Sequence, residues 1–128
     1  MKYLGVDYGL SKIGMALADD DLRLAVPLQI IHETERAKQL EKVLTVVQTE
    51  EVDRIIVGRP YDSQGKTTSQ TAITDKFIAA LKKQSVPVIL LDERFTTAVA
   101  KRQVERGRDD DAIAAMHILQ NYLDQMDL

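Results

Sequence analysis

The chain has 128 residues, of which 45% are hydrophobic and 29% charged, and its formal net charge is −3. This balance is typical of a globular domain, and it excludes a disordered chain and, since no apolar run is long enough, a membrane-spanning one. The absence of cysteine excludes disulfides, thiolate metal sites and a cysteine nucleophile. We expect one soluble domain over residues 1–128, and a cytoplasmic location because residues 1–7 lack a signal-peptide core.

Three strands are predicted in the first third of the chain. Residues 3–7 and 13–18 are short runs separated by the turn signal Tyr8–Gly9, and a third run covers residues 22–31. Pro27 interrupts the third run, which favours an edge strand or a bulge over a central strand. The tight turns between the runs predict an antiparallel meander.

Helices alternate with strands in the rest of the chain, as the change of hydrophobic period indicates. The order of elements predicts an α/β fold: a mixed five-stranded sheet with helices on both faces. The first expected helix is capped by Thr34 and has Ala37, Leu40, Leu44 and Val47 on its apolar face, and a strand over 53–58, buried on both faces, follows it. Next we expect a helix carrying Ile73, Phe77 and Leu81 and a strand over 87–91. The chain then continues with a helix capped by Thr96 and a helix over 111–125.

Asp7 ends the first strand. Strand alternation places Asp7 on one face with Tyr3 and Gly5, and the intervening residues on the other. The first strand should be central, where a carboxylate is costly unless it is paired, hydrogen-bonded or bound to a metal. The simpler interpretation is an aspartate that caps its own turn, with Gly9 at positive φ.

Asp92 and Glu93 end the fifth predicted strand. Adjacent residues of a strand alternate faces, so at most one of the two acids can point where Asp7 points. The alternative is a solvated pair neutralised by Arg94.

Asp111 heads the apolar face of the last helix. That face continues at helical spacing through small residues that allow close approach to the sheet and then through larger ones, namely Ala114, Ala115, Ile118 and Tyr122. An acid in the first turn can also be explained by helix capping and the helix dipole. Capping alone does not require the acid to lie on the apolar face.

Three acids that meet at one edge of a sheet would form a site for hard cations. Oxygen ligands suit Mg²⁺ or Mn²⁺, and two such ions about 4 Å apart can activate a water and stabilise the leaving oxygen of a phosphodiester. His32 and His117 are both expected at the surface, the second facing solvent. We therefore predict no histidine base.

Motifs along nearly the whole chain resemble the YqgF family, described as Holliday-junction resolvases and as nucleases that mature the 5′ end of pre-16S ribosomal RNA, within the RNase H-like superfamily. The matching segments are Gly5–Gly9 with Lys12–Gly14, Val57–Pro60 followed by Gly65 and Gln70, Asp92–Thr97, and Asp111–Ala115 followed by Ile118–Gln120 and Tyr122–Leu123.

The resemblance implies an RNase H-like five-stranded sheet and phosphodiester hydrolysis in structured nucleic acid that depends on Mg²⁺ or Mn²⁺, with two ions expected. The substrate would be pre-rRNA or branched DNA, and the protein a monomer or weak homodimer without membrane contact. Carried over by position, the catalytic and metal-binding acids are Asp7, Glu93 and Asp111, with Asp7 bridging the ions. The candidate substrate contacts are Lys12, Arg59 and Arg94.

Two features depart from the family pattern. Arg59 stands where the middle motif usually has an apolar residue. Residues 105–110, with two arginines and three acids, replace a segment that is commonly lysine-rich, which bears on substrate affinity more than on chemistry.

Two alternative functions are open. One is a non-catalytic nucleic-acid-binding or ribosome-assembly factor that retains the fold. The other is a nucleotide-binding module like the actin-like ATPases, for which this chain lacks room for a second lobe.

Overall fold

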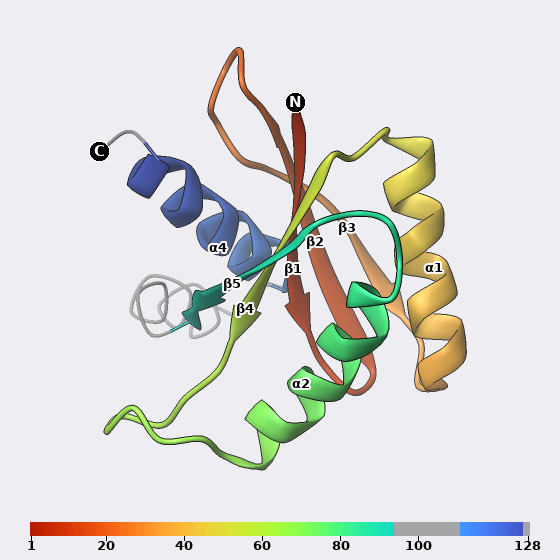
Figure 1. Ribbon diagram of the computed structural model, residues 1–128, viewed down its shortest axis with the longest axis vertical. Helices are drawn as coiled ribbons and strands as arrows, with labels where there is room; N and C mark the ends of the chain where they lie inside the picture. Colours follow the sequence, from red (N-terminus) through yellow and green to blue (C-terminus); the bar gives the residue numbers. More distant parts are fainter. Residues whose placement is uncertain (94–110, 127–128) are drawn as a thin grey trace.

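The computed structural model describes residues 1–93 and 111–126, and it forms one five-stranded sheet with helices on both faces (Figure 1). The predicted helix after Thr96 lies outside the described residues. The elements are β1 (Lys2–Tyr8), β2 (Lys12–Asp19), β3 (Val26–His32), α1 (Arg36–Thr49), β4 (Arg54–Arg59), α2 (Ser69–Lys82), β5 (Val88–Asp92) and α4 (Asp111–Met126).

The sheet has the order β3-β2-β1-β4-β5, so β1 is central as predicted. β1 pairs antiparallel with β2 and parallel with β4, and β4 pairs parallel with β5. The three parallel strands therefore bring their carboxyl ends to the same edge of the sheet. The meander is confirmed, since β2 also pairs antiparallel with β3.

β3 is an edge strand, which confirms the interpretation of Pro27. Its register against β2 shifts between Met15 and Ala16, and Pro27 lies opposite Ala16 at this irregularity. Proline has no N–H to donate to a ladder, so the edge and the bulge are the places that tolerate it.

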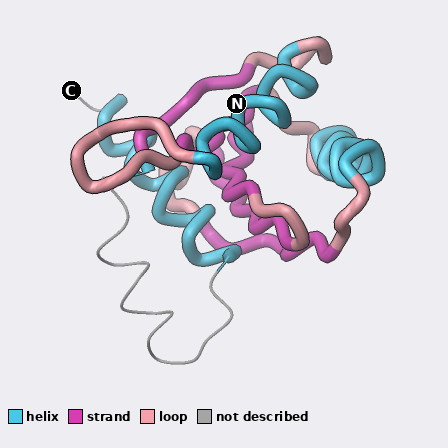
Figure 2. The backbone as a smooth tube through the Cα atoms, turned by 90° about the horizontal axis from the view of Figure 1, so that it is seen from below, coloured by secondary structure: helices cyan, strands magenta, loops and turns pink. Residues whose placement is uncertain are grey.

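Two helices cover one face of the sheet and α4 covers the other (Figures 1 and 2). Leu4 and Val6 pack in a core with residues of α1 and α2, whereas Tyr3 packs in a second core with Ala115 and Ile118 of α4. The predicted alternation along β1 is therefore confirmed. Among the described residues, no helix has both the length and the apolar character needed to cross a membrane.

Two predicted boundaries are wrong. The third strand begins at Val26 and not at residue 22, because the chain turns before it, with Arg23 in the left-handed region at φ 53°. Thr34 does not cap α1: the Glu33 carboxylate accepts hydrogen bonds from the N–H groups of Thr34 and Glu35, and the helix begins at Arg36. The N-cap residue is Glu35, and its own side chain makes no capping hydrogen bond.

The buried face of α1 is also rotated from the prediction. Its buried residues are Gln39, Val43, Val46 and Val47, while Leu40 and Leu44 are only partly buried. The polar side chain of Gln39 thus occupies the core position that the apolar periodicity predicted for Leu40.

Helix α4 rests directly on glycines of the sheet. A Cβ atom on Gly14 of β2 would lie 1.9 Å from the carbonyl oxygen of Asp111, and one on Gly5 of β1 would lie 2.7 Å from that of Ala115. On Gly58 of β4 it would lie 2.5 Å from Cδ1 of Ile118. The predicted close approach of the helix at its small residues is confirmed, and the sheet provides the matching space.

These contacts predict an order of stability for two glycine substitutions. Gly14→Ala should lower the free energy of unfolding at the upper end of the roughly 1–3 kcal/mol typical of overpacking, because the obstacle is helix backbone. Gly58→Ala should cost less, because the end of the Ile118 side chain can move. Chemical denaturation of both variants measures the order, and an equal or reversed cost would contradict this packing.

Candidate active site

Asp7 lies near the carboxyl end of the central strand and faces α4. Its register partner in β2 is Gly14, the glycine on which the first residue of α4 rests. The side chain is half-buried. The missing side chain at Gly14 therefore leaves the start of the helix close to the Asp7 carboxyl group.

Glu93 reaches Asp7 from the end of β5. The two carboxyl groups are hydrogen-bonded to each other, although β4 lies between their strands. A Cβ atom on Gly58 of β4 would lie 3.0 Å from Cγ of Glu93. The glycine thus gives the Glu93 side chain room to cross β4, and of the two candidates at this strand end Glu93 is the acid that meets Asp7.

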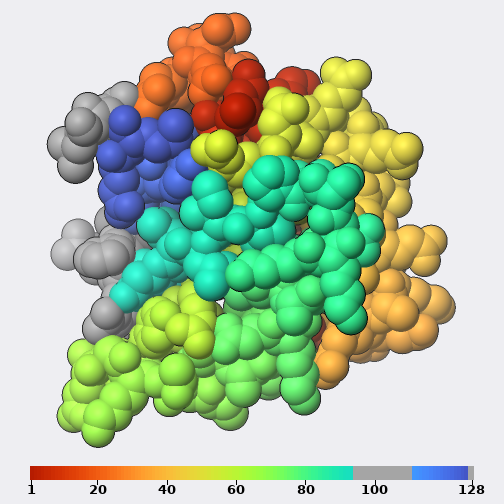
Figure 3. Space-filling model, in the orientation of Figure 1, coloured from red at the N-terminus to blue at the C-terminus, as the bar shows by residue number. Residues whose placement is uncertain are grey.

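Asp111 is the first residue of α4 and lies within electrostatic range of Asp7. The structure therefore brings together the three acids that were predicted to meet, one each from β1, the end of β5 and α4. In Figure 3 the atoms of α4 lie directly beside those of β5, in agreement with the shared core of Leu91 and Ala115.

Burial raises the pKa of Asp7 well above its usual range, and the hydrogen bond that the Asp7 carboxyl group donates to Glu93 and the charges of Glu93 and Asp111 raise it further. A carboxylate in this position is unfavourable without a compensating positive charge. In the chain alone, burial therefore favours the protonated form of Asp7. A bound cation would supply the missing charge instead.

The donor set fits a hard divalent cation. All three side chains offer carboxylate oxygens, the ligands that Mg²⁺ and Mn²⁺ favour. Within residues 1–93 and 111–126 no three histidine or acidic side chains are already arranged to hold a metal ion. Metal binding at this site would therefore require the Asp7–Glu93 hydrogen bond to open.

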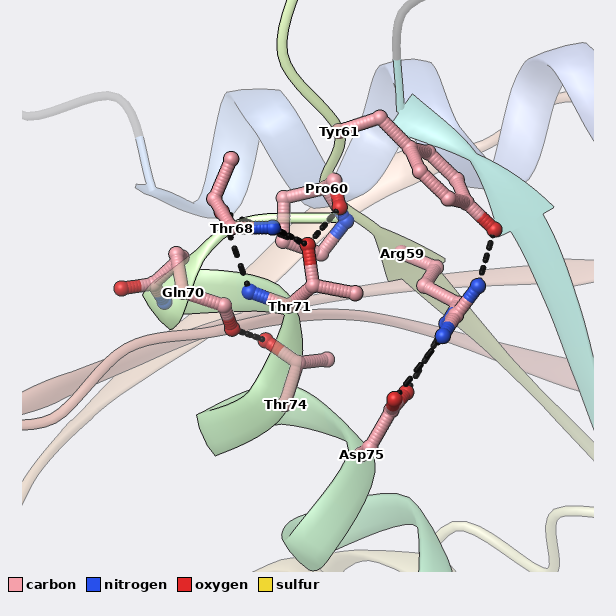
Figure 4. A network of polar contacts seen from close by, with 8 residues as sticks. All are labelled: Arg59, Pro60, Tyr61, Thr68, Gln70, Thr71, Thr74 and Asp75. Carbon is pink, nitrogen blue, oxygen red and sulfur yellow. Dashed lines mark hydrogen bonds and ion pairs between the residues drawn. The ribbon is translucent and has the colours of Figure 1, made fainter. Parts of the chain in front are cut away.

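The predicted substrate contacts have different surroundings. Lys12 is exposed at the start of β2, and Arg94 lies outside the described residues. Arg59 ends β4, and its guanidinium donates two hydrogen bonds to the Asp75 carboxylate, each of 2.8 Å (Figure 4). It also donates to the Tyr61 hydroxyl.

The contacts of Arg59 hold the loop between β4 and α2. Its other end is held by the Thr68–Thr71 capping box, and the Thr71 hydroxyl donates to the carbonyl oxygen of Pro60 (Figure 4). A bidentate pair with Asp75 raises the pKa of Arg59 and lowers that of Asp75. These contacts show that Arg59 holds the loop between β4 and α2 in place. Its contact with a substrate stays a prediction.

Two expectations near the site are wrong. Gly9 does not adopt positive φ, which among the described glycines belongs to Gly65 at 81°; Gly9 is needed because a Cβ atom would lie 2.6 Å from the carbonyl oxygen of Lys12. His117 does not simply face solvent: its Nε2 is buried without a hydrogen-bond partner in the described part of the chain, and burial lowers its pKa. His32 is exposed, as predicted.

Sequence reasoning missed the residues that shape the site without ligating anything. Gly14 and Gly58 stand inside strands, where glycine often marks a close approach, and this signal was readable. Gln39, buried beside the turn that follows β1, left no such signal because charged residues such as Lys38 and Glu41 surround it in the sequence.

A mixed five-stranded sheet with three acids gathered beside its central strand defines an RNase H-like protein. Residues 1–125 match the family described as "RuvX: Holliday junction resolvase". The chain therefore belongs to the RuvX family, and the resemblance to YqgF proteins is confirmed.

Curated relatives match over most of their length. A protein of Rickettsia africae named "Putative pre-16S rRNA nuclease" is 35% identical, over 96% of this chain and 86% of its own. The protein of the same name from Rickettsia typhi is 37% identical, over 91% of this chain and 81% of its own.

Solved structures share the fold at low sequence identity. RuvC of T. thermophilus in complex with a Holliday junction substrate has a TM-score of 0.66 at 14% identity, covering 98% of this chain and 95% of that one. The yeast mitochondrial Holliday junction resolvase Ydc2 has a TM-score of 0.53 at 12% identity, covering 94% and 77%. These likenesses establish the RNase H-like architecture.

Asp7→Asn should stabilise the protein when metal is removed with EDTA. The pKa of Asp7 is higher in the folded than in the unfolded chain, so its contribution is complete in acid and is lost as the pH rises through the folded pKa. We expect Tm to rise by a few degrees at pH 8, where about 1 kcal/mol corresponds to about 4 °C, and by less at pH 5. Thermal unfolding at both pH values measures this.

The matched control is Glu41→Gln on the exposed surface of α1, which should leave Tm unchanged at both pH values. A loss of stability in Asp7→Asn at pH 8 would contradict the repulsion described here.

Arg59→Ala and Asp75→Ala should each lower the free energy of unfolding by about 1 kcal/mol, because the pair is bidentate but partly exposed. The double variant should cost little more than either single variant. Urea denaturation of the four proteins measures the coupling. If the two single costs add up in the double variant, Arg59 and Asp75 do not stabilise the fold as a pair. The control is Lys66→Ala in the exposed loop, which should leave the free energy of unfolding unchanged.

Proposed function

We propose that this protein is a metal-dependent endonuclease that hydrolyses phosphodiester bonds in structured nucleic acid. The observation that carries the proposal is the Asp7–Glu93 carboxyl pair at the carboxyl end of the central strand, with Asp111 within electrostatic reach. Maintaining such a cluster costs stability. A domain that only bound a polyanion would gain nothing from negative groups at its centre.

Asp7, Glu93 and Asp111 would hold Mg²⁺ or Mn²⁺, with two ions expected. When bound, such ions activate the attacking water and stabilise the charge on the leaving oxygen. The carboxylates themselves would position the ions, because α4 packs closely on Gly5 and Gly14 of the sheet and Gly58 leaves room for the Glu93 side chain. Glu93 and Asp111 would also orient the water by accepting its hydrogen bonds.

We propose the 5′ end of pre-16S ribosomal RNA as the substrate, and thus a role in ribosome biogenesis in the cytoplasm, as a monomer or weak homodimer. The support is the name carried by relatives of 35% and 37% identity. Resolution of Holliday junctions is the second candidate, favoured by the description of the family. Lys12 and Arg94 are the proposed substrate contacts in either case, with Arg59 as a third if its pair with Asp75 opens.

A cleavage assay tests the proposal. Purified protein should cut a labelled precursor-rRNA fragment with Mg²⁺ or Mn²⁺ and not with EDTA, and a four-way DNA junction less well. Asp7→Asn, Glu93→Gln and Asp111→Asn should each reduce cutting at least about a hundredfold, since each removes part of the site on which the charge stabilisation depends.

The matched control is Asp92→Asn, next to Glu93 on the same strand end, which should retain activity. Better cutting of the junction would move the substrate to branched DNA. No cutting of any substrate with any metal, with binding retained, would overturn the nuclease and favour the non-catalytic assembly factor.

A further inference from the structure

One buried side chain of α1 holds the turn between β1 and β2 from the interior of the protein. Gln39 of α1 is 1% exposed, and its Nε2 donates to the carbonyl oxygens of Gly9 at 3.2 Å and Leu10 at 3.0 Å. The same nitrogen donates to the carbonyl oxygen of Glu33 at 2.7 Å, so its two hydrogens are shared among three carbonyl groups. Two successive carbonyl groups of the turn therefore point towards a single atom in the protein interior.

The anchor is itself held in place. The Tyr8 hydroxyl donates to Oε1 of Gln39 at 2.8 Å, and the Tyr8 ring stacks on Phe77 of α2 with 4.4 Å between ring centroids. Every hydrogen-bonding group of the buried amide is thus engaged, which is the condition for placing an amide in a core. An apolar side chain would fill the same space but would leave the turn unattached.

The direction of the carbonyl groups determines that of the N–H groups. Every peptide bond described is trans, and in a planar trans peptide the N–H points opposite to the C=O. The N–H groups of Leu10 and Ser11 therefore point away from Gln39 and from α1. Leu10 is 56% exposed, Ser11 is exposed, and within residues 1–93 and 111–126 neither N–H has a hydrogen-bond partner.

This outward-facing pair lies next to the candidate active site. Leu10 is three residues after Asp7, so their Cα atoms are at most about 11 Å apart. Asp7 also points away from α1, since it projects from the face of the sheet that α4 covers. The exposed cationic residue Lys12 follows the turn directly.

We propose that the main-chain N–H groups of Leu10 and Ser11 bind a phosphate of the nucleic-acid backbone close to the scissile bond, and that Gln39 is the residue that positions them. The inference rests on the proposed nuclease function and adds a phosphate contact to it. Main-chain donors suit a chain of net charge −3, because they attract a phosphate without the basic surface that drives indiscriminate binding.

The first test is a titration of ¹⁵N-labelled protein with dimethyl phosphate, followed by NMR at constant ionic strength. The amide resonances of Leu10 and Ser11 should shift saturably, and those of other exposed residues should not. Gln39→Met, which keeps the length of the side chain but has no amide donor, should abolish the saturable shift. Gln48→Met on the exposed surface of α1 is the matched control and should behave as the unmodified protein.

The second test separates positioning from general stability. In the cleavage assay Gln39→Met should raise KM about tenfold, the effect of one or two weakened hydrogen bonds, with kcat changed less than threefold. A methylphosphonate next to the scissile bond should weaken binding to the unmodified protein and add no further loss in Gln39→Met.

The outcomes are distinguishable. No saturable shift at Leu10 and Ser11 in the unmodified protein overturns the inference, and this holds even when Gln39→Met fails to fold. If the protein cleaves its substrate but shows no saturable shift, the nuclease function is retained and the phosphate contact is rejected. A saturable shift without cleavage of any substrate supports the phosphate contact and removes the nuclease.

Discussion

The contact between α4 and the sheet is the constraint on which the site depends. A layer of side chains normally separates the backbone of a helix from the backbone of the sheet that it covers. Here Gly5 and Gly14 remove that layer, so that backbone of α4 lies against backbone of β1 and β2. Asp111 is thereby brought to the level of Asp7, and a helix end becomes part of a cluster that would otherwise hold only two acids.

The same device operates on the other side of β1. Gly58 interrupts a strand that is otherwise buried and β-branched, and its missing side chain is the space that Glu93 uses to reach Asp7. Glycine weakens the interior of a strand. The cost at three strand positions is consistent with a site that needs three acids from separate elements within reach of one another, and with close packing that holds them there.

Much of this arrangement was predictable because it follows from period and order. Strand alternation placed Asp7 on the α4 face, and helical spacing placed Asp111 at the head of the stripe that packs there. The connections between strands predicted a central β1. What the sequence pattern could not supply is pairwise and non-local. It includes the register that sets Gly14 opposite Asp7 and the pairing of Arg59 with Asp75 sixteen residues away. Strand alternation does not choose between Asp92 and Glu93; the family resemblance implies Glu93.

Gln39 shows most clearly why such residues escape sequence reasoning. Its position on the inner face of α1 follows from Val43 and Val46, four and seven residues later, yet a glutamine there reads as an interruption of the apolar pattern. Only the fold shows that the carbonyl groups it binds belong to the turn after β1. The buried amide of Gln39 and the Asp7–Glu93 carboxyl pair are alike in one respect. Each is an unfavourable group in a core, and each is satisfied by specific partners. In the proposed function they would turn the two sides of the β1 end towards the same strand of nucleic acid. The carboxylates would face the reacting phosphate through metal, and the turn would face a neighbouring phosphate.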